Sequence, residues 1–436
     1  MMSPELIGVI GIIVFLVLIL LKVNVGLSLI LVGFLGVSLL SDFNVGLAQL
    51  GSSAFGTVNS YSLSVIPLFI LMGMFMSNTG LGRDLFVAVD KWIGHLRGGL
   101  AIATVGASSI FSAISGSANA TTATIARITL PEMNEYKYNK TFSTSAVVAG
   151  GTLGALIPPS VLLIIYGDLT SEPIGHLLIA GIIPGIIMTI LFMIMINIQV
   201  RLNPNLAPRK TEKTSLKQKF VSLKNVWPFL LIFIVSIGGI YFGIFTPSEA
   251  GGVGAMGAFL VTLILKRLTF KGLINSLDET IKLTVMIFLI LIGASLFGKF
   301  LALSQIPIFL GNKVATYEVS PYLIIFIIFI IYFILGMFLE GIALMVLTLP
   351  IVYPLVIQLG FDGIWFGIII IIVTNIALLT PPLGLSVFII SGVVKDVPIE
   401  KIFKGVIPSV ITMVIFTILL IIFPEIATFL PNLIKH

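Results

Sequence analysis

Two groups of small polar residues interrupt otherwise apolar segments of the chain, and their oxygen atoms could do chemistry. The first group is the run Ser115-Gly-Ser-Ala-Asn-Ala-Thr-Thr122 together with the glycines and threonine before Pro158-Pro159. The second lies around Glu340 and between Thr374 and Pro382. Neutral hydroxyl, amide and carbonyl oxygens suit Na⁺, whereas a proton relay would use chains of Asp, Glu or His. The sequence therefore favours sodium sites at these two places.

The candidate residues fall into two overlapping sets. Candidate sodium ligands are Ser115, Gly116, Ser117, Asn119, Gly151, Thr152, Gly336, Gly341, Thr374, Asn375 and Thr380. Candidate substrate contacts are Ser117, Asn119, Thr121, Thr122, Pro158, Glu340 and Pro381. The alternative is that small residues merely let helices pack closely while Ser and Thr satisfy the backbone, and that Glu340 faces extracellular water. The occurrence of similar groups in both halves of the chain favours binding sites.

The elements that position these residues must be membrane helices. Of the 436 residues, 58% are hydrophobic and 10% are charged, whereas about a quarter of a soluble domain is charged. Many apolar runs approach or exceed the ~20 residues that span hydrocarbon. This composition excludes a soluble enzyme, a disordered chain and a fibrous protein, and it predicts an all-α polytopic membrane protein.

The composition also excludes several chemistries. The chain has no cysteine, so disulfides, thiol nucleophiles, iron–sulfur clusters and Cys-type zinc sites are absent. Its histidines, His95, His176 and His436, are far apart, so a histidine metal site is not expected and Na⁺ is the one metal ion expected, with no other cofactor. A serine protease built on Ser115 would lack a base, so no enzyme is expected.

The polar groups lie where apolar segments break. Backbone groups cannot be left bare in hydrocarbon, so a break must be buried in protein or line a cavity. We expect two re-entrant helical hairpins, at residues 98–130 and 319–358, and two helices broken at Pro-Pro, at 141–167 and 362–394. Such breaks expose carbonyls that can bind cations and helix N-termini that can face anions.

The two halves of the chain repeat each other. Thr129-Leu-Pro131 in the first half recurs as Thr348-Leu-Pro350 in the second. Pro158-Pro159 recurs as Pro381-Pro382 at nearly the same interval. Because one half begins outside and the other inside, the repeat has inverted topology, which is typical of secondary transporters.

The expected organisation is a first repeat, residues 1–200, a basic cytoplasmic loop, 201–224, and a second repeat, 225–436. In the first repeat the remaining elements are scaffold helices 5–80, a surface arm 81–97 and a helix 174–200. In the second they are scaffold helices 226–265, a surface arm 270–282, a helix 284–303, an outer arm 304–318 and a last helix 404–423.

The distribution of basic residues orients these elements. With both termini outside, all but Lys299, Lys313 and Lys435 of the 24 Lys and Arg residues lie on the cytoplasmic side, as the positive-inside rule requires. The basic run 201–224 lacks interleaved aromatic residues and is interpreted as a solvated loop, so no nucleic-acid partner is expected.

Five motifs, in this order, resemble the large membrane subunit of tripartite ATP-independent periplasmic (TRAP) transporters. They are Ile66-Pro-Leu-Phe-Ile-Leu-Met-Gly73, Gly150-Gly-Thr-Leu-Gly-Ala-Leu-Ile-Pro-Pro-Ser160, Ala180-Gly-Ile-Ile-Pro-Gly185, Thr246-Pro-Ser-Glu-Ala250 and Thr380-Pro-Pro-Leu-Gly384. The resemblance extends over nearly the whole chain.

This resemblance implies an elevator-type transporter of the ion-transporter superfamily in the bacterial cytoplasmic (inner) membrane. It implies sodium-coupled uptake of a carboxylate-bearing organic anion, such as a C4-dicarboxylate or a sialic acid. The implied partners are a small four-helix membrane subunit, expected here as a separate chain, and a periplasmic substrate-binding protein. Stand-alone sodium/carboxylate symport and ion antiport remain alternatives, whereas the transporter symmetry of the chain opposes a channel.

Overall fold

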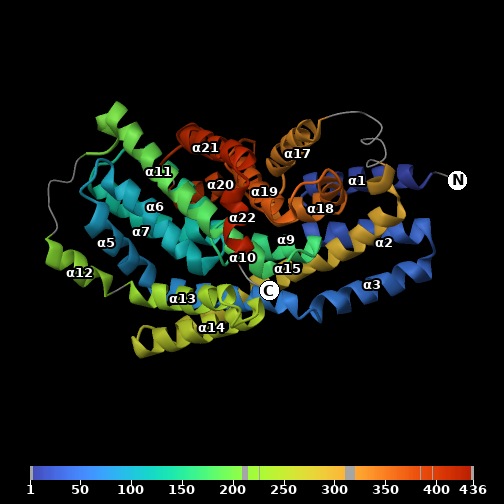
Figure 1. The fold of residues 1–436 in the computed structure, drawn as a ribbon, viewed down its shortest axis with the longest axis horizontal. Coiled ribbons are helices and arrows are strands. Elements are labelled where there is room, and N and C mark those ends of the chain that lie inside the picture. The colour runs from blue at the N-terminus through green and yellow to red at the C-terminus, as the bar shows by residue number, and fades with distance from the viewer. Residues whose placement is uncertain are drawn as a thin grey trace.

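The computed structural model describes residues 3–208, 215–224, 226–309, 320–382, 384–394 and 396–433, and within these ranges it contains helices and no strand. Five helices are long and apolar enough to cross a membrane, or up to seven if each of two bent pairs counts as one span. The helices lie side by side in an elongated body (Figure 1). The all-α polytopic prediction is confirmed.

The first four of the five N-terminal helices form a layer with one long helix from the second half of the chain, whereas the fifth packs against the first hairpin. Their bounds are α1 Pro4–Leu20, α2 Val25–Leu40, α3 Phe43–Val58, α4 Val65–Asn78 and α5 Leu81–Ile93. Helix α15, Phe270–Leu303, packs along α2 and α4. One prediction about this region is wrong, because α15 continues without interruption through the expected arm 270–282 and helix 284–303. No proline or cap breaks it, and Lys282 pairs with Asp278 one turn earlier.

The first hairpin and broken helix follow in the expected order. Their bounds are α6 Gly99–Ser115, α7 Ala118–Glu135, α8 Lys140–Thr152, the 3₁₀ turn η2 Leu153–Ala155, α9 Val161–Thr170, α10 Ile174–Ala180 and α11 Ile182–Leu202. The return arm α7 extends past residue 130, since it accommodates Pro131 within the helix.

Part of the basic loop is ordered against the surface arm α5. Helix α12, Leu216–Leu223, begins with a capping box formed by Ser215 and Gln218. The indole of Trp92 donates a hydrogen bond to the carbonyl of Lys219, 3.1 Å away. The expectation of a fully solvated loop is therefore wrong for this segment.

The second half repeats the order of hairpin, broken helix and long helix. Its further bounds are α13 Trp227–Tyr241, α14 Pro247–Ile264, α17 Pro321–Gly336, α18 Gly341–Gln358, α19 Gly363–Leu378, α20 Leu385–Val393, α21 Ile399–Ile422 and α22 Glu425–Asn432. Most of the expected outer arm 304–318 lies outside the described residues. The last long helix starts at Ile399 rather than 404, and α22 follows it.

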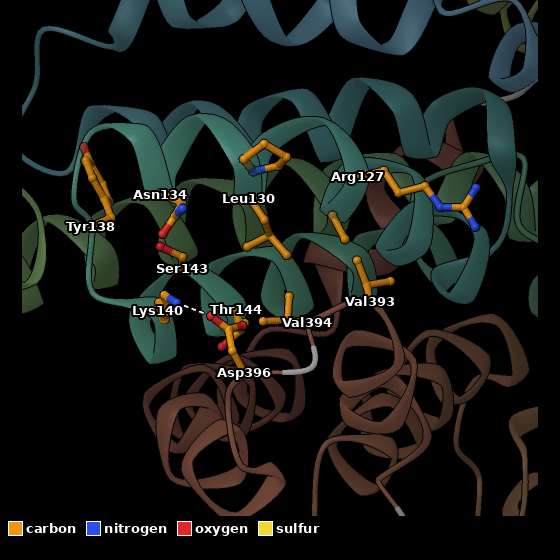
Figure 2. A pocket seen from close by; sticks show the side chains of 12 residues that line it. Arg127, Leu130, Asn134, Tyr138, Lys140, Ser143, Thr144, Val393, Val394 and Asp396 are labelled. Carbon is orange, nitrogen blue, oxygen red and sulfur yellow. Dashed lines mark hydrogen bonds and ion pairs between the residues drawn. The ribbon is translucent and has the colours of Figure 1, made fainter.

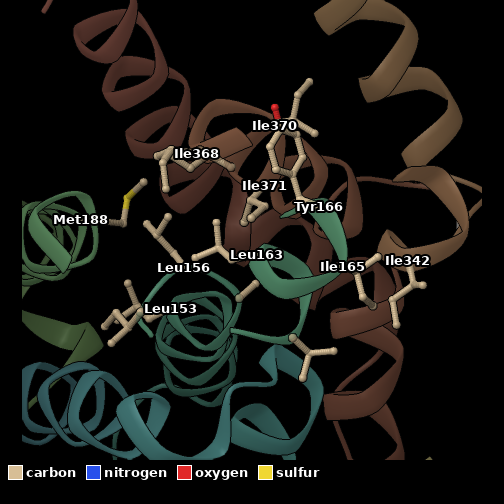
Figure 3. Close-up of a cluster of buried hydrophobic side chains, with 14 of the residues drawn as sticks. Leu153, Leu156, Leu163, Ile165, Tyr166, Met188, Ile342, Ile368, Ile370 and Ile371 are labelled. Atoms are coloured by element: carbon tan, nitrogen blue, oxygen red, sulfur yellow. The ribbon is translucent and has the colours of Figure 1, made fainter. Parts of the chain in front are cut away.

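The two halves share one apolar core. Figure 3 shows Leu153, Leu156 and Leu163 of the first broken helix packed among Met188 of α11 and Ile368 of α19. Helix α19 is buried along nearly its whole length. The core therefore fixes the broken helices of both halves relative to each other.

Candidate functional site

The tip of the first hairpin is pinned to the first Pro-Pro break. Gly116 adopts a left-handed conformation, φ +62°, that ends α6, and Ser117 caps α7. The carbonyl of Gly116 accepts a hydrogen bond, 3.1 Å long, from the backbone N–H of Val161. A Cβ on Gly116 would collide with the carbonyl oxygen of Pro159. The hairpin therefore requires glycine at this point.

Several candidate hydroxyls form a layer behind this tip. Ser115 Oγ lies 2.7 Å from Thr121 Oγ1, and Thr122 Oγ1 donates to the carbonyl of Ala118 at 2.8 Å. A Cβ on Gly151 would collide with Thr122 Oγ1, and one on Gly154 would lie 2.6 Å from the carbonyl oxygen of Ser117. The structure thus brings the hairpin tip and the glycine-rich end of α8 into direct contact, as expected from the sequence.

The second hairpin meets the second broken helix in the same way. A Cβ on Gly336 would lie 2.7 Å from the Cβ of Ala377, and one on Gly341 would lie 3.3 Å from the Cγ2 of Thr374. The Cδ1 of Leu162, at the start of α9, would also be 3.3 Å from that Cβ of Gly341. Gly341 therefore joins the second hairpin to the broken helices of both halves.

A cavity of about 320 Å³ lies between the two hairpin tips. Six of the candidate residues line it: Gly116, Ser117, Asn119, Glu340, Gly341 and Asn375. Residues from both polar groups, one group from each half of the sequence, thus line one cavity.

The other candidates lie outside the cavity wall. Ser115, Thr121, Thr122, Gly151 and Thr152 stand behind the first tip, and the Thr152 hydroxyl donates to the carbonyl of Ala149.

In the second half, Gly336 and Thr374 lie behind the tip, and Thr380 Oγ1 donates to the carbonyl of Ile376 at 2.8 Å. Pro158 and Pro381 form the cis Pro-Pro bonds of the two breaks and do not line the cavity.

Two buried oxygens at the site have no hydrogen-bond partner among the described residues. They are Asn119 Oδ1 and Thr374 Oγ1, one from each half of the chain. Buried polar atoms are nearly always paired, and an exception needs an explanation such as an ion or water. Both atoms are neutral oxygens of the kind that binds Na⁺.

The cavity also receives the N-terminal ends of three helices. Ala118 begins α7, Gly341 begins α18 and Val161 begins α9, and all three residues line the cavity. Helix N-termini carry partial positive charge and free N–H groups, which favour an anion. The Glu340 side chain lies at the same place, so a carboxyl group adjoins these helix N-termini.

Sequence reasoning missed the apolar wall of the cavity. Ile70 of α4, Leu162 of α9, and Leu283, Met286 and Ile287 of α15 complete the lining. Aliphatic residues in membrane helices carry no signal that separates a cavity wall from a lipid-facing or core position, and only the packing of α15 on the hairpins reveals them.

Two hairpins whose tips line one cavity in an all-α membrane body are typical of a membrane transporter. The chain belongs to the family described as "Tripartite ATP-independent periplasmic transporter, DctM component", whose model matches residues 12–426. The resemblance drawn from the five motifs is therefore confirmed, and the family is one of transporters.

Relatives of known name agree with this assignment. The C4-dicarboxylate TRAP transporter large permease protein DctM of Pseudomonas aeruginosa is 34% identical over 93% of this chain and 94% of its own. The sialic acid large permease protein SiaM of Vibrio cholerae is 32% identical over 94% and 95%. The sialic acid permease protein SiaT of Haemophilus influenzae is 31% identical over 98% of this chain but 68% of its own.

Solved structures with a similar fold are also transporters. The Alcanivorax borkumensis YdaH transporter aligns with a TM-score of 0.62 over 87% of this chain and 89% of its own. Neisseria gonorrhoeae MtrF aligns with a TM-score of 0.63 over 96% and 94%. Both are 12% identical, so they support the fold alone.

Proposed function

We propose that this TRAP large permease carries out sodium-coupled uptake of a carboxylate-bearing organic anion by an elevator mechanism. The observation that carries the proposal is the cavity between the two hairpin tips, where three helix N-termini meet. These N-termini can hold a carboxylate without a basic side chain. C4-dicarboxylate and sialic acid are the substrates named for two of the relatives, and both classes bear carboxylates.

Sodium coupling is supported by the unpaired oxygens beside the cavity. Asn119 Oδ1 and Thr374 Oγ1 are buried without partners among the described residues, and Asn375 is 2% exposed on the cavity wall. A bound Na⁺ would satisfy such atoms. In an elevator mechanism the hairpins would move along α4 and α15, which contact the hairpin helices α6 and α18.

The same proposal covers location and partners. The chain would lie in the bacterial inner membrane with both termini outside, and it would work with a separate small four-helix subunit and a periplasmic binding protein. The H. influenzae relative is longer than this chain, which is consistent with fusion of a further subunit there. A stand-alone symporter of the same fold would transport without these partners.

Uptake by the reconstituted system tests the function. Proteoliposomes that contain the large and small subunits, with binding protein and labelled C4-dicarboxylate or sialic acid outside, should accumulate label only under an inward sodium gradient. Replacing Na⁺ by K⁺ should reduce accumulation to the level of empty liposomes. Equal accumulation with K⁺ would refute sodium coupling, and uptake without binding protein would favour the stand-alone symporter.

Replacing Asn119 or Asn375 by alanine should weaken sodium dependence. Each change removes an amide oxygen at the cavity, so we expect the Na⁺ concentration for half-maximal uptake to rise about tenfold, equivalent to ~1.4 kcal/mol of binding free energy. Asn44→Ala is the matched control, because Asn44 lies on the exposed side of α3. An unchanged sodium requirement in both variants would remove these residues from the site.

A further inference from the structure

A hydrogen bond joins the two repeats beyond the end of α9. Glu172, two residues after this helix, accepts a hydrogen bond 2.5 Å long from the hydroxyl of Tyr353 on α18. The Glu172 carboxylate lies against Gly363, the first residue of α19, where a Cβ would collide with it. The hydroxyl of Tyr166 also donates to the carbonyl of Gly363, at 2.6 Å.

An ion pair joins the repeats beyond the end of α20. Asp396, three residues after this helix, pairs with Lys140, the first residue of α8 (Figure 2). The hydrogen bond from Lys140 lowers the pKa of Asp396, so this carboxyl group is ionised at neutral pH. A pocket of about 260 Å³ separates this pair from Asn134 and Arg127 of α7.

The acids of the two contacts, and the first residues of the broken helices that they meet, occupy corresponding positions in the repeats. Tyr353, which donates to Glu172, lies on the hairpin helix α18 and has no counterpart in the second contact. The interval in sequence from Glu172 to Asp396 nearly equals the interval between the two Pro-Pro pairs. The interval from Lys140 to Gly363 equals it as well. In each case an acid after the second half of one broken helix reaches the start of the other repeat's broken helix. Their recurrence at matching positions is hard to ascribe to chance contacts between neighbouring loops.

We propose that these two contacts, the Glu172–Tyr353 clasp and the Lys140–Asp396 clasp, are positioning contacts for transport. Each contact holds the C-terminal end of one half-helix, α9 or α20, to the opposite repeat. Helix α9 has ten residues, about 15 Å, and its first residues line the cavity. Freeing the far end of α9 would shift the cavity wall directly, whereas freeing α20 would act through α7, against which it packs. The clasps thus keep both hairpins and both broken helices together as one moving unit. This inference rests on the proposed function.

The two clasps differ in expected strength. The side chains of Lys140 and Asp396 are 52% and 57% exposed, and exposed ion pairs contribute little and are screened by salt. The Glu172–Tyr353 hydrogen bond is partly buried and charge-assisted, and it is supported by the ring of Tyr166, 6.1 Å from that of Tyr353. Charge-assisted bonds are the stronger class, so this clasp should matter more.

Loss of the Glu172–Tyr353 clasp should change sodium affinity more than the maximal rate. For Tyr353→Phe and Glu172→Ala we expect a three- to tenfold higher Na⁺ concentration for half-maximal uptake in the reconstituted system, with a maximal rate within twofold of the unmodified protein. Glu172→Gln, which keeps an acceptor oxygen, should recover most of the affinity. Tyr322→Phe is the matched control, since Tyr322 is 62% exposed at the start of α17. Equal sodium affinity in Tyr353→Phe and Tyr322→Phe would overturn the proposal for this clasp.

The cysteine-free chain allows a direct test of the Lys140–Asp396 clasp. In the double variant Lys140→Cys, Asp396→Cys, a short bifunctional thiol reagent should cross-link the two cysteines. The cross-linked protein should keep at least half of the sodium-driven uptake of the same variant before cross-linking, because the proposal keeps these two positions together throughout transport. Loss of uptake on cross-linking, reversed when the linker is cleaved, would show that the ends separate and would overturn it. Sodium-driven uptake by the unmodified protein is measured alongside, and its absence would count against the proposed function rather than the clasps.

Discussion

Replacing Gly116 by alanine is expected to abolish uptake. The left-handed φ of +62° costs a residue with a side chain about 1–3 kcal/mol, and the new methyl group would collide with the carbonyl oxygen of Pro159. That oxygen belongs to a rigid Pro-Pro break, so it cannot move aside cheaply. Relief would pull the tip off the break and lengthen the hydrogen bond from Val161 N–H. The cavity and its sodium candidates would then lose their shape together.

A second alanine variant separates this local effect from a general one. Gly56 lies on an exposed part of α3, and a Cβ there would meet nothing within 4 Å. Gly56→Ala should therefore keep uptake and melt at the same temperature or higher, since alanine is the better helix former. Gly116→Ala should melt several degrees lower and show less than a tenth of normal uptake. Normal uptake by Gly116→Ala would contradict the close contact between hairpin tip and Pro-Pro break.

The parts of the fold that could be predicted from the sequence are those marked by residue types that are unusual in an apolar chain. Polar residues such as Ser117 and Asn119 stand out in an apolar chain, and the Pro-Pro pairs mark the breaks. These signals located both hairpins and both broken helices. They failed at α15, because the charged residues of 270–282 suggested a surface arm, whereas nothing in the chain ends the helix before Leu303.

The site was only partly predictable, because its contacts are distant in sequence. Residues that touch the cavity, such as Asn119 and Asn375, could be named by type. Thr380 does not line the cavity, because its hydroxyl donates to the carbonyl of Ile376 in the preceding helix. Which polar residues face the cavity depends on the length of helix that precedes each break. Met286 of α15 and the Glu172–Tyr353 contact depend on the packing of helices that are far apart in the chain. A single sequence records no such packing.

Replacing Thr374 by valine is expected to have opposite effects on stability and on sodium binding. Thr374 is fully buried, and its hydroxyl has no hydrogen-bond partner among the described residues. Removal of an unsatisfied buried hydroxyl, with the shape kept, should stabilise the sodium-free protein by about 1 kcal/mol. If the hydroxyl binds Na⁺, the same change should raise the sodium requirement for uptake about tenfold and reduce the stabilisation that added Na⁺ gives in thermal melts.

Thr129→Val distinguishes this behaviour from that of an ordinary buried threonine. Thr129 is also fully buried, but its hydroxyl donates to the carbonyl of Ile125 at 3.0 Å, and it lies at neither hairpin tip. Its loss should slightly lower the melting temperature and leave the sodium requirement unchanged. If Thr374→Val instead matched Thr129→Val in both measurements, the Thr374 hydroxyl would be a structural group, and the sodium site would have to be built from Asn119, Asn375 and backbone carbonyls at the breaks. The opposite signs make the test independent of any general loss of folding, because a misfolded variant cannot be the more stable one.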